Sequence, residues 1–517
     1  MTGLAKTDCV AVIGAGAMGA GIAQVAAAAG HPVLLFDARA DAAKAGRDGI
    51  VAILDRLVTK AKISPAERDA ISSRLTVATA LEDLRDAQLV IEAIVENLEV
   101  KRDLFNRLES VVSHETILAT NTSSLSVTAI ASGLRFPERF AGLHFFNPAP
   151  LMQLVEVISG LASSKQVLHR LHETVLTWGK TPVHATSSPG FIVNRIARPY
   201  YAEALRLYEE QVASPQTIDA ILRSSGGFRM GPFELMDLIG HDVNFAVTRS
   251  VFEAFFGDPR YRPSLVQKEL VAAGWLGRKS GRGFYHYTEG AVRPEPATAP
   301  QYPAPTQVTI EGDLGPAEPL VNCIEEKGIS VVRQTGTGLI RVAETSLRLT
   351  DGHSATALVS EGAPPNLVLF DLAKDFATAT RVAIAQAANA APEAIAAAIG
   401  LFQILGKQVS VVEDSPGLIV FRTVAMLANE AMEAVLTGVA TPDDIDRALR
   451  LGMNFPDGPL TWADRIGGGL ILAGLDAIHA ETGDPRYRAS LRLRQRVTSG
   501  RTLADPSHQS RGVTVWV

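Results

Sequence analysis

A histidine and a glutamate twelve residues apart could form a general base. His144 lies in an apolar stretch at residues 140–145, and Glu156 lies in a second one at residues 152–158, with a Pro-rich corner at residues 147–150 between them. We predict two strands folded back on each other, which would bring the two side chains face to face. The glutamate could then accept the ring N–H, fix the tautomer and stabilise the imidazolium formed when a proton is taken. For this pair alone, a structural core histidine beside a strand-end glutamate is an equally good interpretation.

A glycine-rich turn near the N-terminus carries the second pattern. Residues 14–19 read GAGAMG, after a predicted strand at residues 10–13 and before a predicted helix at residues 20–29. A further predicted strand, at residues 32–36, ends on Asp37. A lone GxGxxG is weak evidence, but this order of strand, turn, helix, strand and acidic residue favours a dinucleotide site.

Each residue of this turn has a predicted task. Gly14 permits the turn, Gly16 lets the backbone approach a pyrophosphate, and Gly19 lets the helix pack closely, with Met18 in the same turn. The helix N-terminus would direct its N–H groups at the phosphates. Asp37 would hydrogen-bond the adenine ribose hydroxyls and repel a 2′-phosphate, which favours NAD over NADP.

The elements that must position these residues form a predicted Rossmann domain at residues 1–188. A helical arm at residues 41–75 would project beside the nucleotide cleft, and its Lys60 and Lys62 could meet an anionic substrate tail. A solvated helix face is an equally good interpretation of either lysine. A later strand, at residues 89–93, precedes Glu96 and the predicted helix that carries Lys101.

Small polar residues follow another predicted strand at residues 117–119. Asn121 and Ser123 belong to the sequence NTSS at residues 121–124. At the carboxyl edge of a parallel sheet such residues lie where substrates bind. Helix capping is the alternative role for the serines.

The second half of the chain contains an internal repeat. Residues 189–287 predict an all-α domain whose first helix, at 191–210, carries Asn194, and a Pro/Ala/Glu-rich stretch at 288–319 predicts a linker. Ser-Pro-Gly at 188–190 recurs at 415–417, and Gly-Pro at 231–232 recurs at 458–459, both with a spacing of 227. We therefore predict a second all-α copy at 415–517.

Between the copies, residues 320–414 predict a degenerate α/β segment without a complete phosphate-binding loop or His–Glu pair. Its predicted elements are strands at 339–342 and 367–370 and a helix from Pro392. The position that corresponds to Asn194 is Phe421. The second copy is accordingly predicted to be structural, and the first copy to hold the working site.

Together, the GAGAMG turn, NTSS, GLHFFNPAPLMQLVE (142–156) and SPGFIVNR (188–195) resemble the L-3-hydroxyacyl-CoA dehydrogenase family over about residues 8–287. The duplicated C-terminal domain is similar to the long bacterial branch that includes 3-hydroxybutyryl-CoA and 3-hydroxyadipyl-CoA dehydrogenases. The resemblance implies NAD-dependent oxidation of (S)-3-hydroxyacyl-CoA to 3-oxoacyl-CoA.

The resemblance also implies roles for single residues. His144 would be the catalytic base and Glu156 its partner, Asn194 would help to hold the histidine and the thioester region, and Ser123 would hydrogen-bond the 3-hydroxyl or keto oxygen. Asn121, Glu96 and Lys101 would lie near the cofactor, Glu96 and Lys101 beside the nicotinamide ribose and the substrate, and the arm at residues 41–75 would contact CoA.

Two other functions fit the same residues less well. One is a dehydrogenase of the same fold that acts on a sugar acid or another 3-hydroxy acid without CoA. The other is a non-catalytic NAD-binding protein, against which the set of Ser123, His144, Glu156 and Asn194 argues. Acyl chain length depends on pocket shape. The protein is expected to form a homodimer or an intrachain pseudo-dimer of its two all-α copies.

Bulk composition excludes several further classes. A net charge of −6 without a basic run gives no reason to expect nucleic acid. Cys9 and Cys323, the only cysteines, have no metal-ligand spacing, so zinc and disulfides are not expected. Without a signal peptide or an apolar run of about 18 residues, we expect a cytoplasmic protein with no membrane span.

Overall fold

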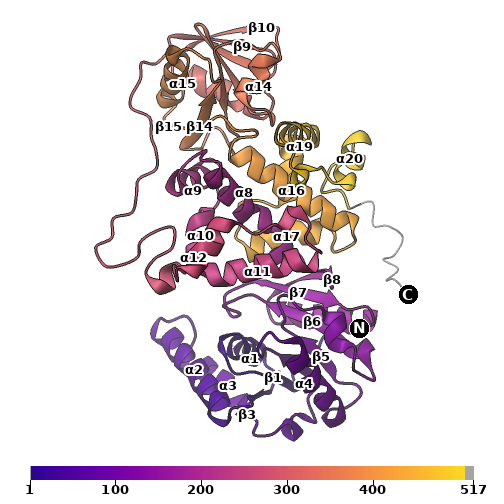
Figure 1. Ribbon diagram of the computed structural model, residues 1–517. Helices are drawn as coiled ribbons and strands as arrows, with labels where there is room; N and C mark the ends of the chain where they lie inside the picture. Colours follow the sequence, from indigo (N-terminus) through magenta and orange to yellow (C-terminus); the bar gives the residue numbers. More distant parts are fainter. Residues whose placement is uncertain (1, 507–517) are drawn as a thin grey trace. The chain divides into compact units, whose positions relative to one another are not determined.

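The computed structural model describes residues 2–506 and divides them into two compact units (Figure 1). Unit 1 comprises residues 2–195 and 438–453, and unit 2 comprises residues 196–437 and 454–506. Residues 507–517 of the predicted second copy lie outside the described residues. Unit 1 runs past the predicted boundary at residue 188 to residue 195, and residues 438–453 belong with it.

Unit 1 is built on an eight-stranded sheet in the order β3-β2-β1-β4-β5-β6-β7-β8. The strands are β1 (Val10–Ile13), β2 (Val33–Phe36), β3 (Leu75–Val77), β4 (Leu89–Glu92), β5 (Ile117–Thr120), β6 (Phe140–Phe145), β7 (Leu154–Ser159) and β8 (Thr181–Thr186). Every neighbouring pair is parallel except β6 and β7. The central strands β1, β4, β5 and β6 are buried along their whole length because helices cover both faces of a parallel sheet. The predicted Rossmann fold is confirmed.

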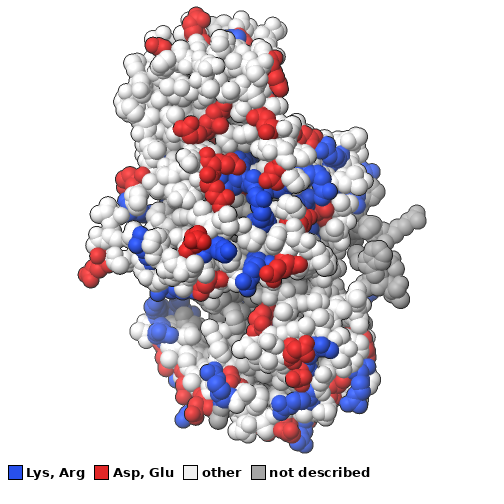
Figure 2. Space-filling view, in the orientation of Figure 1, with Lys and Arg blue, Asp and Glu red and all other residues white. Residues whose placement is uncertain are grey.

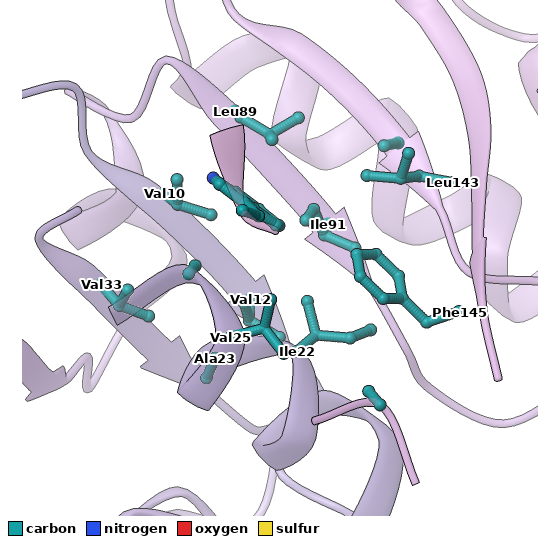
Figure 3. Close-up of a cluster of buried hydrophobic side chains, with 14 of the residues drawn as sticks. Val10, Val12, Ile22, Ala23, Val25, Val33, Leu89, Ile91, Leu143 and Phe145 are labelled. Atoms are coloured by element: carbon teal, nitrogen blue, oxygen red, sulfur yellow. The ribbon is translucent and has the colours of Figure 1, made fainter. Parts of the chain in front are cut away.

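Helices of unit 1 cover this sheet. They are α1 (Ala17–Ala29), α2 (Ala40–Thr59), α3 (Pro65–Ser73), α4 (Leu98–Val111), α5 (Val127–Ala131), α6 (Lys165–Thr177), α7 (Val193–Ile196) and α17 (Pro442–Gly452). Figure 3 shows Val10 and Val12 of β1 against Ile22 of α1, with Ile91 of β4 and Phe145 of β6 beside them. Each large buried side chain of this kind stabilises the fold by roughly 1.5–3 kcal/mol.

The predicted helical arm is formed by α2 and α3. Ser64 begins α3 with a reciprocal cap, in which its hydroxyl accepts the Glu67 N–H and its own N–H donates to the Glu67 carboxylate. The chain then returns to the sheet as β3.

Residues 438–453 come from the second all-α copy but belong to unit 1, because they contain the amphipathic helix α17. It presents Ile445, Ala448 and Leu449, all buried, and packs on β7 and β8. The main chain joins as well, since the Thr186 N–H donates to the Val439 carbonyl.

The single predicted helix at 191–210 is wrong. The structure has α7 and then α8 (Arg198–Glu209), interrupted at Ala197. Pro199 has no N–H to give to the preceding turn, so a continuous helix would lose a hydrogen bond there. The equivalent residue of the second copy, 227 positions on, is Met426, and α16 (Val420–Leu436) runs unbroken through it.

Unit 2 contains the helices of both all-α copies. The first copy supplies α8, α9 (Pro215–Ser224), α10 (Pro232–Ile239), α11 (His241–Ala254) and α12 (Leu265–Ala272). The second supplies α16, α18 (Pro459–Ile466), α19 (Gly468–Thr482) and α20 (Leu491–Thr498). Short 3-10 turns at Pro259–Tyr261 (η3) and Pro485–Tyr487 (η6) carry the repeated sequence DPRYR.

A second sheet in unit 2 has the strand order β10-β9-β11-β12-β13-β14-β15. Its strands are β9 (Gln307–Glu311), β10 (Ser330–Gln334), β11 (Leu339–Val342), β12 (Thr345–Leu349), β13 (Leu367–Phe370), β14 (Arg381–Gln386) and β15 (Gln408–Val411), with α13 (Pro319–Glu326), α14 (Ala355–Ser360) and α15 (Pro392–Ile404). β9 contradicts the predicted linker at 288–319. Val308 and Ile310 alternate with polar residues and are buried, a strand pattern within a segment whose overall composition is that of a linker.

The two all-α copies pack against each other through equivalent residues. The Tyr261 hydroxyl donates to Glu430 Oε1 at 2.6 Å, and the Tyr487 hydroxyl donates to Glu203 Oε2 at 2.8 Å. Glu203 and Glu430 are 227 positions apart, and the two tyrosines are 226 apart. Reciprocal contacts of this kind are the mark of a two-fold interface.

The described surface carries mixed charge. On the face shown in Figure 2, Lys and Arg side chains lie among Asp and Glu. Among residues 2–506, no helix is both long and apolar enough to cross a membrane. The same residues hold no group of three or more side chains suited to a metal ion.

Candidate active site

The histidine and the glutamate lie directly opposite each other on antiparallel strands. His144 on β6 pairs in register with Glu156 on β7, and Nδ1 of the ring is 2.6 Å from Glu156 Oε2. Both side chains are buried, and the rings of Phe146 and Phe191 lie against the imidazole. No described residue is hydrogen-bonded to Nε2. With Nδ1–H donating to the carboxylate, Nε2 is the nitrogen left to take a proton.

Glu156 has a second set of partners. Its Oε1 accepts the N–H groups of Ile192 and Val193, each at 3.0 Å. These groups lie at the start of α7, where backbone donors have no partner within the helix. One carboxylate thus fixes the histidine and the helix that carries Asn194.

Polar residues at the carboxyl end of β5 lie beside α7. The Asn194 Nδ2 donates to the carbonyl of Ser123 at 3.4 Å. Glu96 Oε1 accepts the N–H groups of Ser123 and Ser124, at 2.9 and 3.1 Å, and the hydroxyl of Thr122 at 2.6 Å. The structure therefore brings Ser123 and Asn194 together. Glu96 holds the loop at residues 122–124, to which Ser123 belongs.

Burial alone would raise the pKa of Glu96, but the nearby Lys101 ammonium and the donors of residues 122–124 lower it overall. Lys101 Nζ is 2.5 Å from Glu92 Oε1 and 3.3 Å from Glu96 Oε2, and its side chain is 1% exposed. Thr120 donates its hydroxyl to the other oxygen of Glu92 at 2.7 Å. The predicted place of Lys101 beside the cofactor and substrate stays a prediction. The ammonium is enclosed by two carboxylates, and it supports the loop through Glu96.

The glycine-rich turn has the geometry that phosphate binding needs. Gly14 has a φ of 100°, and a side chain on Gly19 would meet the Gly14 carbonyl oxygen. A side chain on Gly16 would meet no atom within 4 Å, so the backbone there is open to a ligand. The helix begins at Ala17 rather than at the predicted residue 20, and Met18 in its first turn is half-buried against the core.

Asp37 joins this turn to the end of β2. Its carboxylate accepts the N–H groups of Ala15 at 2.9 Å and Arg39 at 3.0 Å. Burial by itself would raise the pKa of Asp37, but these two donors and the Arg39 guanidinium lower it overall. The carboxylate is therefore ionised, next to a helix N-terminus that no side chain caps. These residues fit a dinucleotide whose ribose hydroxyls face an acid and whose phosphates face backbone N–H groups.

The other predicted contacts fall into two groups. Asn121 Oδ1 accepts the Phe145 N–H at 2.8 Å, so this side chain fixes the strand that carries the histidine. Lys60 and Lys62 are both exposed, next to each other in the turn between α2 and α3. The structure leaves both lysines accessible without placing them at the histidine.

Comparison with known proteins accounts for nearly the whole chain. Residues 9–188 match the 3-hydroxyacyl-CoA dehydrogenase NAD-binding domain, and residues 190–287 and 417–506 match the C-terminal domain of the same enzymes. The chain belongs to the 3-hydroxyacyl-CoA dehydrogenase family. Residues 347–416 match the reduced Rossmann-fold domain of 3-hydroxybutyryl-CoA dehydrogenase.

Two full-length relatives come from Escherichia coli K12. The chain is 47% identical over 494 residues to a 3-hydroxyadipyl-CoA dehydrogenase, a match that covers 95% of this chain and 98% of that protein. It is 46% identical, with a TM-score of 0.88, to a crystal structure of 3-hydroxybutyryl-CoA dehydrogenase, covering 96% and 99% of the two chains. The mitochondrial hydroxyacyl-coenzyme A dehydrogenase of Sus scrofa is 45% identical over 285 residues, which cover 54% of this chain and 90% of that protein.

Two residues that hold the site in place, Glu92 and Lys180, were not predicted from the sequence. Glu92, the last residue of β4, holds Lys101. Lys180 Nζ donates to the carbonyls of Ala149, Pro150 and Met152, and so anchors the corner between β6 and β7. Its recurrence as Lys407, which donates to two carbonyls of its own copy, was the available signal.

The reduced Rossmann segment does not repeat the catalytic pair. The register of β13, β14 and β15 matches that of β6, β7 and β8 with the spacing of 227, which puts Asp371 in the place of His144 and Ala383 in the place of Glu156. The Asp371 carboxylate accepts the N–H groups of residues 419–421. The contact with the helix start is kept in the second copy, whereas the histidine is not.

Proposed function

We propose that the protein oxidises (S)-3-hydroxyacyl-CoA to 3-oxoacyl-CoA with NAD⁺, using His144 as the general base. The observation that carries the proposal is the 2.6 Å contact between His144 Nδ1 and Glu156 Oε2, which leaves Nε2 available. Family membership and the names of the full-length relatives support the same reaction.

His144 Nε2 would take the proton of the 3-hydroxyl group as the alcohol is oxidised. The Glu156 side chain would stabilise the resulting imidazolium through Nδ1–H. Ser123 would hydrogen-bond the 3-oxygen, and Asn194 would keep the Ser123 loop in place through its 3.4 Å contact. NAD⁺, when bound, accepts the hydride from carbon 3. Since a proton is released, oxidation is favoured as the pH rises and ketone reduction as it falls.

The test is NADH oxidation with acetoacetyl-CoA, with 3-oxoadipyl-CoA and with free acetoacetate. Turnover of the CoA esters alone is expected. Comparable turnover of free acetoacetate would favour a dehydrogenase that does not need CoA. No turnover of any of the three would favour a non-catalytic NAD-binding protein.

The same assay addresses the acyl group. One full-length relative is named for a hydroxyadipyl substrate and the other for a hydroxybutyryl substrate. We propose one of these two classes for this protein. The ratio of kcat/KM for 3-oxoadipyl-CoA to that for acetoacetyl-CoA distinguishes them.

The His144→Gln variant tests the assigned base. We expect turnover to be lost while the NADH dissociation constant stays within about twofold, because the ring serves the proton and not the nucleotide. A loss of NADH affinity as large as the loss of turnover would contradict this role.

We further propose that the second all-α copy takes the place of a partner subunit. The reciprocal contacts of Tyr261 with Glu430 and of Tyr487 with Glu203 support this proposal. A chain that ends near residue 287 should expose that surface and associate in sedimentation experiments. A folded, fully active monomer of that length would contradict the proposal.

Finally, we propose the cytoplasm as the location. Cys9 and Cys323 are both free thiols, which fits a reducing compartment. Fractionation of cells that produce the tagged full-length protein tests this, and recovery in an oxidising compartment would contradict it.

A further inference from the structure

The interface between the two all-α copies departs from its symmetry at one point. Arg260 lies 3.5 Å from Glu430 and 3.7 Å from Glu433, so its buried guanidinium faces two carboxylates. The equivalent arginine, 226 positions on, is Arg486. The residue that corresponds to Glu433 is Arg206, so a second cation stands beside Arg486 where Arg260 faces a carboxylate.

A cavity lies beside this departure, within unit 2. Its volume is about 40 Å³, and four arginines line it, namely Arg198, Arg206, Arg262 and Arg486. Glu209 is the single acidic residue of the lining, and its Oε1 accepts the Ser264 hydroxyl. A volume of this size exceeds what one water molecule needs, so the cavity suits a small anion.

Carboxylates do not balance these arginines. Asp484 pairs with Arg206 at 2.8 Å and lies 3.7 Å from Arg486. The remaining neighbours, Glu203 and Glu210, are held by Arg422 at 2.9 Å each. Counting Arg422 with the four arginines of the lining, five guanidinium groups face the four carboxylates of Glu203, Glu209, Glu210 and Asp484, so an excess of one positive charge remains around the cavity.

Arg198 is the clearest sign of a missing counter-charge. It is 5% exposed, yet no carboxylate among residues 2–506 lies within 4.0 Å of its guanidinium. Nη1 donates to the Thr248 hydroxyl at 3.1 Å, the guanidinium carbon lies 4.8 Å from the Tyr201 ring centre, and Nε has no partner. The Nε atoms of Arg206 and Arg486 are also buried without hydrogen-bond partners, although Arg486 Nε lies 3.7 Å from Asp484 Oδ1. A buried guanidinium without an anion is costly, which makes a bound anion the simplest compensation.

The other half of the interface lacks this charge. Ala425 and Ala428 stand where Arg198 and Tyr201 stand in the first copy, and both alanines are completely buried. The arginine cluster therefore occurs once per chain.

We propose that the cavity between α8, α12 and η6 binds one small oxyanion, such as phosphate or a short dicarboxylate. Guanidinium groups present paired N–H donors that match the oxygens of either anion. The site would hold the two all-α copies together, and it is independent of the proposed dehydrogenase reaction.

Thermal unfolding of the full-length protein tests the proposal. Sodium phosphate and sodium adipate are titrated separately, with sodium chloride keeping the ionic strength constant. At about 100-fold above the dissociation constant, we expect an anion-specific rise of roughly 5 °C in Tm, and calorimetry should give one site per chain. A response to phosphate alone, to adipate alone or to both identifies the anion. A response to neither beyond that of chloride overturns the proposal.

Variants locate the site. In Arg198→Met, which removes the charge at similar volume, the response should disappear and the Tm without anion should rise. Arg206→Glu introduces the residue type found at the equivalent position, Glu433, and should also abolish the response. This second variant tests the proposal if Arg198→Met does not fold. Arg229→Met replaces an exposed arginine that does not line the cavity and should respond like the wild type. An undiminished response in both cavity variants would overturn the assignment.

Discussion

Replacing Glu156 with glutamine separates the two tasks of this side chain. The amide keeps the shape of the carboxylate but has one oxygen and one NH₂ group. In the wild type, Oε1 accepts two backbone N–H groups at 3.0 Å and Oε2 lies 2.6 Å from His144 Nδ1. If the amide oxygen faced the histidine, the NH₂ group would face the N–H groups of Ile192 and Val193. Each buried N–H left without an acceptor costs about 1–3 kcal/mol.

The amide oxygen should therefore stay with the backbone, and the NH₂ group should face the ring. Nδ1 must then accept a hydrogen bond, which moves the ring proton to Nε2, where the base has to act. An Asp-to-Asn change beside a catalytic histidine lowers kcat by about 10⁴ for this reason. We expect Glu156→Gln to lower kcat for oxidation by about 10³–10⁴, a loss of roughly 4–5.5 kcal/mol of transition-state stabilisation.

The assay measures kcat with (S)-3-hydroxybutyryl-CoA, the NADH dissociation constant by fluorescence and the Tm of each variant. NADH affinity should stay within about twofold, because the glycine-rich turn is unchanged. Glu99→Gln is the matched control, since this glutamate is 72% exposed on α4. A folded Glu156→Gln enzyme that kept kcat within about tenfold of the wild type would refute the tautomer argument.

Three further predictions concern the cofactor, the loop and the arm. Asp37→Ser should improve kcat/KM for NADP⁺ relative to NAD⁺ by about tenfold or more, because the charge that repels a 2′-phosphate is gone; an unchanged ratio would contradict the assignment. The folded-state pKa of Glu96 is lowered from 4.5, so the stability that its carboxylate contributes is complete above that pH and is lost as the pH falls further. Glu96→Gln should therefore flatten the acid side of the Tm–pH curve. It should also lower kcat by about tenfold. A parallel acid limb in the two proteins would speak against it. Reversing both arm charges in Lys60→Glu/Lys62→Glu should raise KM for CoA esters by about three- to tenfold with kcat nearly unchanged, and an unchanged KM would remove these lysines from the CoA site.

Local sequence was a sound guide where one residue type suits only one geometry. The glycine-rich turn, the strand pair around His144 and the spacing of 227 between the copies each constrain the backbone strongly, so the Rossmann fold and the opposed His–Glu pair followed from them. The break at Ala197 was also readable, because Pro199 two residues later disfavours a continuous helix.

Tertiary packing decided the features that sequence could not predict. β9 lies in a segment rich in Pro, Ala and Glu, and only pairing with β10 and β11 makes it a strand. Lys101 is a charged residue on an amphipathic helix, where the sequence favours exposure. Its burial depends on Glu92, a residue nine positions away on another element. α17 repeats a helix of the first copy, yet it covers β7 and β8 of unit 1 because its apolar face fits there.

The duplicated segment shows which part of the catalytic arrangement the fold itself requires. In both copies a carboxylate accepts the first N–H groups of the helix after the Ser-Pro-Gly corner, Glu156 in the first and Asp371 in the second. Buried helix starts need such an acceptor whether or not chemistry takes place. In the second copy the acid occupies the strand position of the histidine itself, so the acid has no histidine there to orient. Glu156 therefore contributes to stability as well as catalysis, and Glu156→Ala should lower Tm by several degrees, whereas His144→Gln should not.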